Sequence, residues 1–505
     1  MSRNRSIRGR RAVLVAALAA GVCAGMSSAA RSAPTATLCV DTNPGCFSTV
    51  QAAVNAAHDG DTIQIAPGTF QGGITIDKSV KLVGRAAAVT ILRGGGPVIT
   101  IGRFGGDNHL DVVLSRLTIT GGLNDSQPST SVVAGGGVSI PGSAGNAAGA
   151  AVAISESVIT RNRVTARTTI PPGGFSCPLA AGHPCAFVNG GGIDNSGVLT
   201  LTDTRVSDNV AGAAPGGTSI DSNASGGGID NHQQGTLAVR RSFVTGNRVT
   251  VAPPNGAFSD GGGIASGGVL SMVDSVVSGN SSDADAAVPS SFFSGDTQQE
   301  ANAGGIYLRE GSSATIVGST ISDNSVSGSN SIGDAQAQAG GIDDDGSLLL
   351  NDSTVSRNVV HATAPSGTLA LGIEGGIQVG GSLIAHASRI VENVAVATSV
   401  GGFAAATGGG LDNLGQTTLA GTVVSGNRVA ADGAFGVAHG GGISNFTLDP
   451  TNPPRLKLLN SSITDNGVRA SVGITPEGGG LWTDAPVVLV RTVITGNNPD
   501  QCVGC

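Results

Sequence analysis

The chain has 505 residues, of which 81 are glycine, while charged and aromatic residues make up only 12% and 3%. Soluble proteins usually contain about 7% glycine and about 25% charged residues, so an ordinary helical or α/β enzyme core is excluded. Collagen is excluded because the glycines keep no three-residue period, and a positive mean hydropathy argues against disorder. A glycine-rich, folded repeat protein remains.

The first thirty residues have the pattern of a secretory signal. They carry five arginines and no acid, followed by an apolar run from Ala12 to Val22 and small residues up to Ala30. Arg10 and Arg11 loosely fit a twin-arginine signal, and Sec export is the preferred interpretation. We therefore expect residues 1–30 to be removed and the protein to be secreted, either extracellular or associated with a cell surface. No later apolar run is long enough for a transmembrane span.

The charge and the cysteines of residues 31–505 restrict the possible partners and cofactors. Without the signal, 22 basic residues stand against 35 acidic ones, a net charge of -13, which argues against nucleic acid. The six remaining cysteines fall into local pairs, which favours disulfides over a metal site, although fifteen pairings are formally possible. No cofactor or metal is predicted, with Ca²⁺ as the open exception, and we expect a monomer. The pairs are Cys39 with Cys46, Cys177 with Cys185, and Cys502 with Cys505.

The N-terminal part of the chain predicts a helix followed by short strands. Ser48 and Gln51 form a capping-box pattern, and apolar residues recur at helical spacing from Val50 to Ala57. Such a helix would cover the open end of a β-structure. Alternating apolar residues then predict strands at 62–65, 74–76, 80–83, 98–101 and 117–119.

From residue 138 onward the sequence repeats ten times. Each repeat has a glycine pair followed by Val, Ile or Leu, and later a Val or Ile three positions before an Asn. The distance from the first marker to the Asn is nearly constant, whereas the distance from the Asn to the next glycine pair varies. A constant coil with a loop inserted at one corner is therefore expected. The asparagines are Asn162, Asn209, Asn247, Asn280, Asn324, Asn358, Asn393, Asn427, Asn466 and Asn497.

Three short strands per repeat, none able to bury its inner face alone, predict an all-β parallel β-helix of about 12 coils. Stacking would place the Asn, Ser/Thr and Val/Ile columns in ladders about 4.8 Å apart. The expected layout is an N-terminal segment at 31–47, the β-helix with its capping helix at 48–500, and a C-terminal tail at 501–505.

Several segments resemble known families. The run from Thr49 to Val54, with Gly60–Ile63, Pro67–Phe70 and Val80–Gly84, resembles the entrance to β-helices of the pectin-lyase-like superfamily. The two repeat markers are similar to those of polymorphic outer membrane proteins, without the membrane barrel that autotransporters carry. The resemblance implies a right-handed, single-stranded β-helix, but it implies activity only weakly, because this fold hosts lyases, hydrolases, epimerases and non-catalytic proteins.

Acidic residues after the glycine-pair marker are the candidates for catalysis. Asp194 and Asp230 should lie in adjacent coils about 5 Å apart, near the separation of paired carboxyls in retaining glycosidases. Asp343, Asp344 and Asp345 superficially resemble the aspartates of polygalacturonases, but the partner motifs of that family are missing. Turn and ladder hydrogen bonding is the stronger interpretation, with an acid pair or a Ca²⁺ site as the alternatives.

Phenylalanines in the variable segments are the candidates for binding. If all these segments leave the same corner, their aromatic rings should gather along one side of the molecule, either as a small core beneath the loops or as an exposed apolar ridge. The candidates are Phe187, Phe258, Phe292, Phe293, Phe403 and Phe435, with Phe175 nearby in the same class of segment.

Two classes of function follow. The preferred hypothesis is a secreted, non-catalytic β-helix with a structural, adhesive or glycan-binding role, and the alternative is a polysaccharide-active lyase or glycoside hydrolase. A groove that holds two or more convergent carboxylates with an Arg or Lys would favour the enzyme. A smooth shaft with buried Phe side chains would remove both the enzyme and the exposed ridge.

Overall fold

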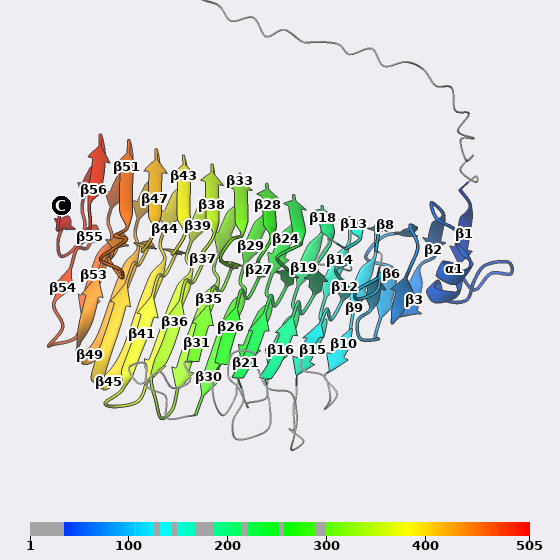
Figure 1. Cartoon of the computed structure of the whole chain (residues 1–505), viewed down its shortest axis with the longest axis horizontal. Helices are drawn as coiled ribbons and strands as arrows, with labels where there is room; N and C mark the ends of the chain where they lie inside the picture. The colour runs from blue at the N-terminus through cyan, green and yellow to red at the C-terminus, as the bar shows by residue number, and fades with distance from the viewer. Residues whose placement is uncertain are drawn as a thin grey trace, which may run out of the picture. The chain divides into compact units, whose positions relative to one another are not determined.

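The computed structural model describes residues 35–505, except residue 107 and segments 126–131, 144–148, 167–184, 214–220, 252–256 and 288–298. Every strand pairing in these residues is parallel, and the strands form four sheets of 14, 18, 13 and 13 strands beside one helix. The described residues are therefore a parallel β-helix, as predicted (Figure 1). The predicted signal at 1–30 lies outside the described residues.

We name the sheets A to D. Sheet A contains β1 (Thr37–Val40), β2 (Thr62–Ile65), β5 (Lys81–Gly84), β8 (Asp111–Ser115), β13 (Ala151–Ser155), β18 (Val198–Thr202), β23 (Thr236–Arg240), β28 (Val269–Val273), β33 (Ser313–Val317), β38 (Ser347–Asn351), β43 (Ser382–His386), β47 (Gln416–Ala420), β51 (Arg455–Leu459) and β56 (Val487–Val490). Sheet B contains β3 (Gly68–Gln71), β6 (Thr90–Arg93), β9 (Thr118–Thr120), β14 (Val158–Thr160), β19 (Arg205–Ser207), β24 (Phe243–Thr245), β29 (Val276–Ser278), β34 (Thr320–Ser322), β39 (Thr354–Ser356), β44 (Arg389–Val391), β48 (Val423–Ser425), β52 (Ser462–Thr464) and β57 (Val493–Thr495). Sheet C contains β4 (Ile74–Ile76), β7 (Ile99–Ile101), β12 (Val138–Ile140), β17 (Ile193–Asn195), β22 (Ile229–Asn231), β27 (Ile264–Ser266), β32 (Ile306–Leu308), β37 (Ile342–Asp344), β42 (Ile377–Val379), β46 (Leu411–Asn413), β50 (Ile443–Asn445), β55 (Leu481–Thr483) and β58 (Cys502–Val503).

Sheet D consists of the strands that lie along the chain between a strand of sheet B and the next strand of sheet C. Its outward strands are β10 (Leu123–Asp125), β15 (Arg163–Ala166), β20 (Val210–Ala213), β25 (Arg248–Val251), β30 (Ser281–Ala286), β35 (Ser325–Asn330), β40 (Val359–Ala364), the first halves of β45 (Val394–Thr407) and β49 (Arg428–His439), and β53 (Gly467–Ala470). Its return strands are β11 (Val132–Ala134), β16 (Cys185–Asn189), β21 (Asp221–Ser225), β26 (Ala257–Asp260), β31 (Gln299–Asn302), β36 (Ala335–Gln338), β41 (Leu369–Ile373), the second halves of β45 and β49, and β54 (Pro476–Glu477).

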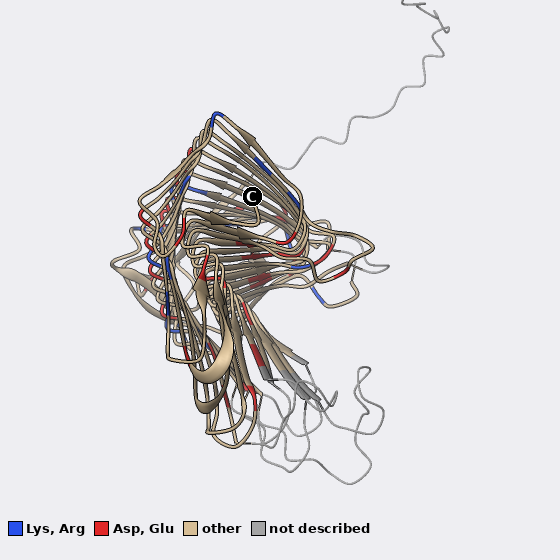
Figure 2. Ribbon diagram, turned by 90° about the vertical axis from the view of Figure 1, so that its left-hand side faces the viewer, with Lys and Arg blue, Asp and Glu red and all other residues tan. Residues whose placement is uncertain are grey.

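These sheet D strands correct the expectation of a loop at one corner. The outward and return strands of each coil form two layers with their own core of alanine and valine, such as Ala211, Ala213 and Ala224. Because these side chains are small, the two layers can approach closely. We call this double layer the fin. It projects from the three-sided coil (Figure 2), and the chain passes through sheet A, sheet B, the fin and sheet C in each turn.

The ten repeat asparagines form a continuous ladder where the chain enters the fin. Asn247 is typical: its Oδ1 accepts hydrogen bonds from the backbone N–H and the side-chain amide of Asn209, both at 3.0–3.1 Å. Its own amide donates to Val206 O and to Asn280 Oδ1, both at 3.0 Å. The same side-chain pairing runs from Asn162 to Asn497, and all ten residues are buried. The ladder therefore ties each coil to its neighbours.

The glycine pairs line the other side of the same neck. A Cβ atom added to Gly192 would lie 2.6 Å from Gly228 O and 2.8 Å from the side-chain amide of Asn209. Gly190, just before the pair, has a φ of 63°, a conformation that other residues adopt only with strain. The two sequence markers thus face each other, and the glycines leave the space that the asparagine ladder occupies.

The helix α1 (Val50–Ala56) lies at the first coil as expected, but its cap differs from the prediction. Thr49, not Ser48, is the N-cap and accepts from Ala52 N at 3.1 Å. Gln51 is used elsewhere: its amide oxygen accepts from Thr75 N at 2.8 Å and its NH₂ donates to Thr75 O at 3.2 Å. Thr75 is in β4, the edge strand of sheet C, so this side chain satisfies exposed edge groups. Sheet A begins still earlier, because β1 pairs with β2.

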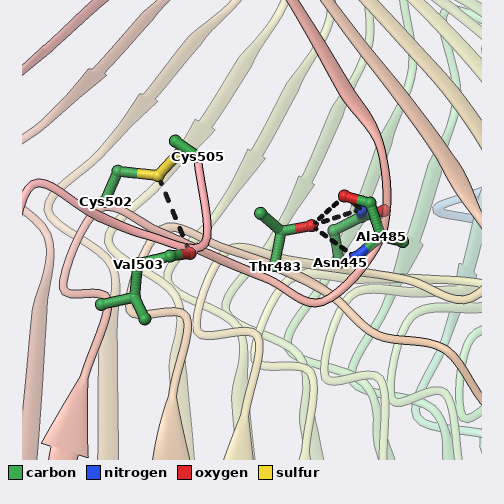
Figure 3. Close-up of a disulfide and its surroundings, with 6 residues drawn as sticks. All are labelled: Asn445, Thr483, Ala485, Cys502, Val503 and Cys505. Carbon is green, nitrogen blue, oxygen red and sulfur yellow. Dashed lines mark hydrogen bonds between the residues drawn. A yellow bond between two sulfur atoms is a disulfide. The ribbon is translucent and has the colours of Figure 1, made fainter.

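The last coil is closed by the chain end. β58 pairs with β55, and a disulfide joins Cys502 to Cys505 beside Thr483, which receives a hydrogen bond from Asn445 (Figure 3). Gln501 ends the asparagine ladder, since its Oε1 accepts from both the backbone and the side chain of Asn497 at 3.0–3.1 Å. At the other end a second disulfide joins Cys39 to Cys46. Cys177 lies outside the described residues, so the third predicted pair stays a prediction.

No helix in the described part of the chain is long and apolar enough to cross a bilayer.

The ladder generates the first prediction. In Asn280→Asp, an acceptor replaces the amide that donates to Val244 O and Asn324 Oδ1, leaving buried acceptors facing each other. Since each buried unsatisfied group costs about 1–3 kcal/mol, the free energy of unfolding should fall by at least about 2 kcal/mol. Denaturant unfolding measures it. Asn351→Asp is the matched control, because Asn351 faces outward at the end of β38 and should change little. Equal losses in both variants would contradict a structural role for the ladder.

Candidate functional site

A cleft runs between the return strands of the fin and sheet C. Its volume is about 760 Å³. One wall is formed by β36, β41, β45, β49 and β54, the floor by β42, β46 and β55, and the opposite wall by the residues that follow the sheet C strands. Each sheet C strand from β4 to β55 has three residues, and the alternation of strand side chains turns its middle residue toward the fin. The residue two positions later faces the same way.

The middle residues of sheet C carry the predicted aspartates. Asp194 and Asp230 are paired in register in adjacent coils, and Asp343 is in register with Tyr307 on one side and Gln378 on the other. Asp345 follows β37 and lies near Tyr307, whose hydroxyl donates to Asp345 Oδ2 at 3.4 Å. The structure thus brings these four aspartates to the fin side of sheet C.

Asp344 lies apart from them. As the third residue of its strand it belongs to the inward column, where Asn195 donates to Asn231 at 2.7 Å. It is fully buried between Leu308 and Val379, accepts from Gly346 N at 3.1 Å, and leaves Oδ2 without a partner. Burial raises the pKa of Asp344 to about 8.

Asp230 is paired with an arginine that reaches it from two coils away. Arg309 Nη1 lies 3.0 Å from Asp230 Oδ1 and Nη2 lies 3.4 Å from Oδ2, and the Ser225 hydroxyl also donates to the carboxylate. The intervening coil has Ala265 and Gly267 at the corresponding positions, so the long arginine side chain has space to cross it. Burial opposes the charge of Asp230, but Arg309 and His232 outweigh it and lower its pKa.

Asp194 is paired with a histidine of the next coil. His232 Nε2 lies 2.6 Å from Asp194 Oδ1, and Ser139 donates to the other carboxyl oxygen at 3.5 Å. Burial opposes the imidazolium, but the carboxylates of Asp230 and Asp194 raise the pKa of His232 to about 9. His232 is therefore protonated at neutral pH.

Two further acids come from the return strands of the fin. Asp260 accepts from Asn302 at 3.2 Å and from Asn223 at 3.3 Å, and burial raises its pKa. Glu300 accepts from the side-chain amides of Gln338 and Gln336, and both glutamines line the cleft. Burial, with the charge of Asp260, raises the pKa of Glu300 to about 7.

These groups form one charged centre across two walls, which we call the acid cluster: Asp194, Asp230, Asp260, Glu300, Asp343 and Asp345, with His232, Tyr307 and Arg309. Burial and the neighbouring carboxyls raise the pKa of Asp343 well above its usual value. Burial also raises the pKa of Tyr307. Environments that push the pKa values of neighbouring carboxyls apart are typical of acid–base sites.

The cleft itself is more apolar, and none of the acid-cluster residues is among the described residues that line it. The rings of His439 and Trp482 stack at 3.9 Å between centroids, and Phe446 lies 6.2 Å from Trp482. Below them Glu374 and Asp412 are buried against each other, and burial raises the pKa of both, that of Asp412 to about 6. Burial lowers the pKa of His439 to about 4, so its ring is neutral at neutral pH.

The phenylalanine candidates are distributed along the fin. Phe187 and Phe258 are partly buried on return strands, and both are in register with Asn223. Phe403 lines the cleft and meets Phe435 edge-to-face at 5.8 Å, while Phe435 is 56% exposed. Phe175, Phe292 and Phe293 lie outside the described residues. The core of the fin is made of alanine and valine instead.

The sequence analysis missed His232, Arg309, Tyr307, Asp260 and Glu300. His232 and Arg309 each stand three positions after the aliphatic residue of the marker, the same offset as Asp345. Reading this second column would have placed them beside the aspartates. Asp260 and Glu300 gave no such signal, because the return strands were interpreted as loops.

Among the residues that the structure describes, no group of three His, Cys, Asp or Glu side chains is arranged to hold a metal ion.

Comparisons with known proteins give similarity to solved structures alone. No protein-family model matches the sequence, and no curated protein matches it. The structure is similar to the A-module of the mannuronan C-5 epimerase AlgE6 of Azotobacter vinelandii, with 15% identity, a TM-score of 0.32, and coverage of 89% of this chain and 95% of that one.

Two alginate lyase structures are also similar. One is AlyF-OU02 in complex with G6 (13% identity, TM-score 0.27, 93% and 87% coverage), and the other is a PL6 alginate lyase in complex with a trisaccharide (13%, 0.29, 91% and 84%). Identities and TM-scores this low do not transfer an activity to this chain, and the resemblance to polymorphic outer membrane proteins stays a prediction.

The buried carboxyl group of Asp344 generates the second prediction. Because the pKa of Asp344 is raised in the folded state, the protein should lose stability as pH rises from about 4 to about 8, by up to about 1.4 kcal/mol per pH unit. Asp344→Asn should be more stable than the wild type at pH 8 and nearly equal at pH 4. Its amide should find backbone carbonyls such as those that Asn195 uses in Gly197 and Thr236. Thermal unfolding at several pH values measures the difference. A difference that is the same at every pH would contradict a buried titrating group.

Proposed function

We propose that the protein is a secreted polysaccharide-active enzyme, and specifically a glycoside hydrolase whose acid–base groups are in the acid cluster. The observation that carries the proposal is a cluster of carboxyl groups that includes Asp230, paired with Arg309, and Glu300, and that is joined to the cleft by Gln336 and Gln338. Several carboxyl groups with an arginine next to a cleft support the enzyme hypothesis. This arrangement does not match the smooth shaft expected of a purely structural protein. The predicted signal at 1–30 and the two disulfides support a site of action outside the cell.

Hydrolysis of a glycosidic bond needs one carboxyl group that is protonated and one that is ionised. Arg309 holds Asp230 ionised, so Asp230 supplies the ionised carboxylate of the proposed pair. Glu300, with a pKa of about 7, can donate a proton to the leaving oxygen. The two residues are two coils apart, about 10 Å along the axis, which is more than the separation of about 5 Å between the carboxyl groups of retaining glycosidases and slightly more than that of about 6.5–9.5 Å in inverting ones.

The same groups disfavour a lyase. A lyase that acts on uronates needs a base to remove a proton and a cation to neutralise the substrate carboxylate. His232 is protonated at neutral pH, and the raised pKa of Tyr307 keeps it as a phenol. Arg309 is already neutralised by Asp230. Many carboxyl groups in the cluster would also repel a polyuronate.

Cleavage tests the assignment of Asp230 and Glu300. In a screen of residues 31–505 against polysaccharides, we expect cleavage of at least one, measured as new reducing ends. Asp230→Asn and Glu300→Gln should each reduce kcat/KM by about 10²–10⁴-fold, the contribution typical of general acid–base catalysis. Asp203→Asn is the matched control, because Asp203 also pairs with an arginine, Arg241, at the corner between sheets A and B. Cleavage that survives both substitutions would refute the assignment.

The pH profile tests the role of Glu300 separately. Activity should fall above about pH 7, as Glu300 loses its proton. Gln338 donates a hydrogen bond to the Glu300 carboxylate and thereby lowers its pKa, so Gln338→Leu should shift this alkaline limb to higher pH. An unshifted limb in an active Gln338→Leu enzyme would mean that another group is the acid.

A further inference from the structure

The ring-lined end of the cleft has unpaired polar atoms that point to a ligand. Gln378 Oε1, Asp412 Oδ1 and both carboxyl oxygens of Glu374 are buried and accept no hydrogen bond, apart from the one that a protonated Glu374 shares with Asp412. Glu374 is fully buried, Asp412 is 4% exposed and Gln378 is 9% exposed. All three residues line the cleft. Buried polar groups normally have partners, and a set of orphans along one cleft indicates groups that a ligand or ordered water satisfies.

The chemistry of these atoms restricts the ligand. Amide and carboxyl oxygens accept hydrogen bonds, so the ligand has to supply donors. Sugar hydroxyl groups supply them, whereas carboxylates and sulfates do not. None of the described residues that line the cleft is Lys or Arg, and Glu374, Asp412 and Glu477 are acidic. A polyanionic chain would find no positive charge there.

The rings supply the apolar part of the site. Trp482, Phe446 and Phe403 line the same cleft, and Trp482 is oriented by a hydrogen bond from its Nε1 to Glu477 at 3.1 Å and by the stacked ring of His439. A pyranose ring has a face of C–H groups and a rim of hydroxyls, so it matches a site with aromatic rings beside hydrogen-bond acceptors. The volume of about 760 Å³ lies within the range of small-molecule sites, about 300–1,000 Å³.

We propose that this end of the cleft, formed by Gln378, Asp412, Glu374, Phe446 and Trp482, binds an uncharged segment of a glycan chain. The inference deepens the proposed function and rests on it, because Gln336 and Gln338 line the cleft and also contact Glu300, so a chain bound here would continue to the acid cluster. The protein then acts on a neutral polysaccharide such as a glucan, xylan or mannan, and polyuronates are excluded from the site.

The only tryptophan of the chain, Trp482, reports binding directly. The experiment uses residues 31–505 with Glu300→Gln, which blocks cleavage in the proposed mechanism. Tryptophan fluorescence is titrated with cellohexaose, xylohexaose and mannohexaose, with hexagalacturonate and chitosan hexamer as charged comparators. We expect a saturable change with at least one neutral hexasaccharide and at least about tenfold weaker binding of hexagalacturonate.

Variants of cleft residues test whether the change in tryptophan fluorescence comes from binding in the cleft. Gln378→Leu removes an orphan acceptor and should weaken binding of the neutral hexasaccharide about tenfold, the effect of losing one buried hydrogen bond. Gln416→Leu is the matched control, because Gln416 is exposed at the start of β47 in sheet A, and it should bind as before. Phe446→Ala should also weaken binding and provides a second variant if Gln378→Leu does not fold.

Each outcome has a separate meaning. No saturable change with any neutral hexasaccharide, or tighter binding of the uronate or amino-sugar oligomer, would overturn the inference. Binding of a neutral hexasaccharide that is unaffected by both Gln378→Leu and Phe446→Ala would overturn the location. Saturable binding in the cleft without cleavage by the wild type would retain the inference and refute the proposed hydrolase instead.

Discussion

The asparagine ladder at the neck of the fin is the interaction on which the other features of this molecule depend. At the neck the chain leaves the coil and returns within a few ångströms of itself, which would ordinarily leave backbone groups unpaired. The asparagine amides satisfy these groups along the axis, and the glycine pairs leave space for them. Because the same neck recurs in successive coils, each return strand keeps a fixed position beside its sheet C strand. The cleft and the acid cluster exist because of that constant spacing.

A regular scaffold of this kind can tolerate an irregular site that lowers the stability of the fold. Apart from Asp344, the inward columns of sheet C are mainly apolar or hydrogen-bonded, whereas the acid cluster buries several carboxyls against two cations, Arg309 and His232, so some of the acids must remain protonated. Such a cluster lowers stability at neutral pH, and the repeated ladders offset that loss. The loss of stability is confined to the coils that carry the acid cluster and their immediate neighbours, because each coil contacts mainly the coils next to it.

The sequence could predict whatever repeats at fixed spacing. The ladder of asparagines, the glycine pairs and the strands of sheets A, B and C follow from columns of identical residues, and the alternation within β37 explains why Asp343 faces the cleft and Asp344 the interior. The fin was missed because strands such as β21 (Asp-Ser-Asn-Ala-Ser) are made of residues with low strand propensity. Contacts such as that of Arg309 with Asp230 were missed because they skip a coil. The small residues Ala265 and Gly267 that make room for this contact are not distinctive in a chain so rich in glycine.

The outward columns of sheet C explain how one scaffold can hold two kinds of site. Positions one and three after the marker's aliphatic residue face the cleft and take no part in the asparagine ladder, so substitution there leaves the ladder intact. In the coils from β17 to β37 these positions hold mostly charged residues, whereas in the coils from β42 to β55 half of them hold amide, hydroxyl or ring side chains and only Asp412 and Asp484 are charged. The fin follows the same division: acids on β26 and β31 give way to Phe403 and His439 on β45 and β49. The two walls change character together along the axis, with the acid cluster in one set of coils and the ring-lined cleft in the other.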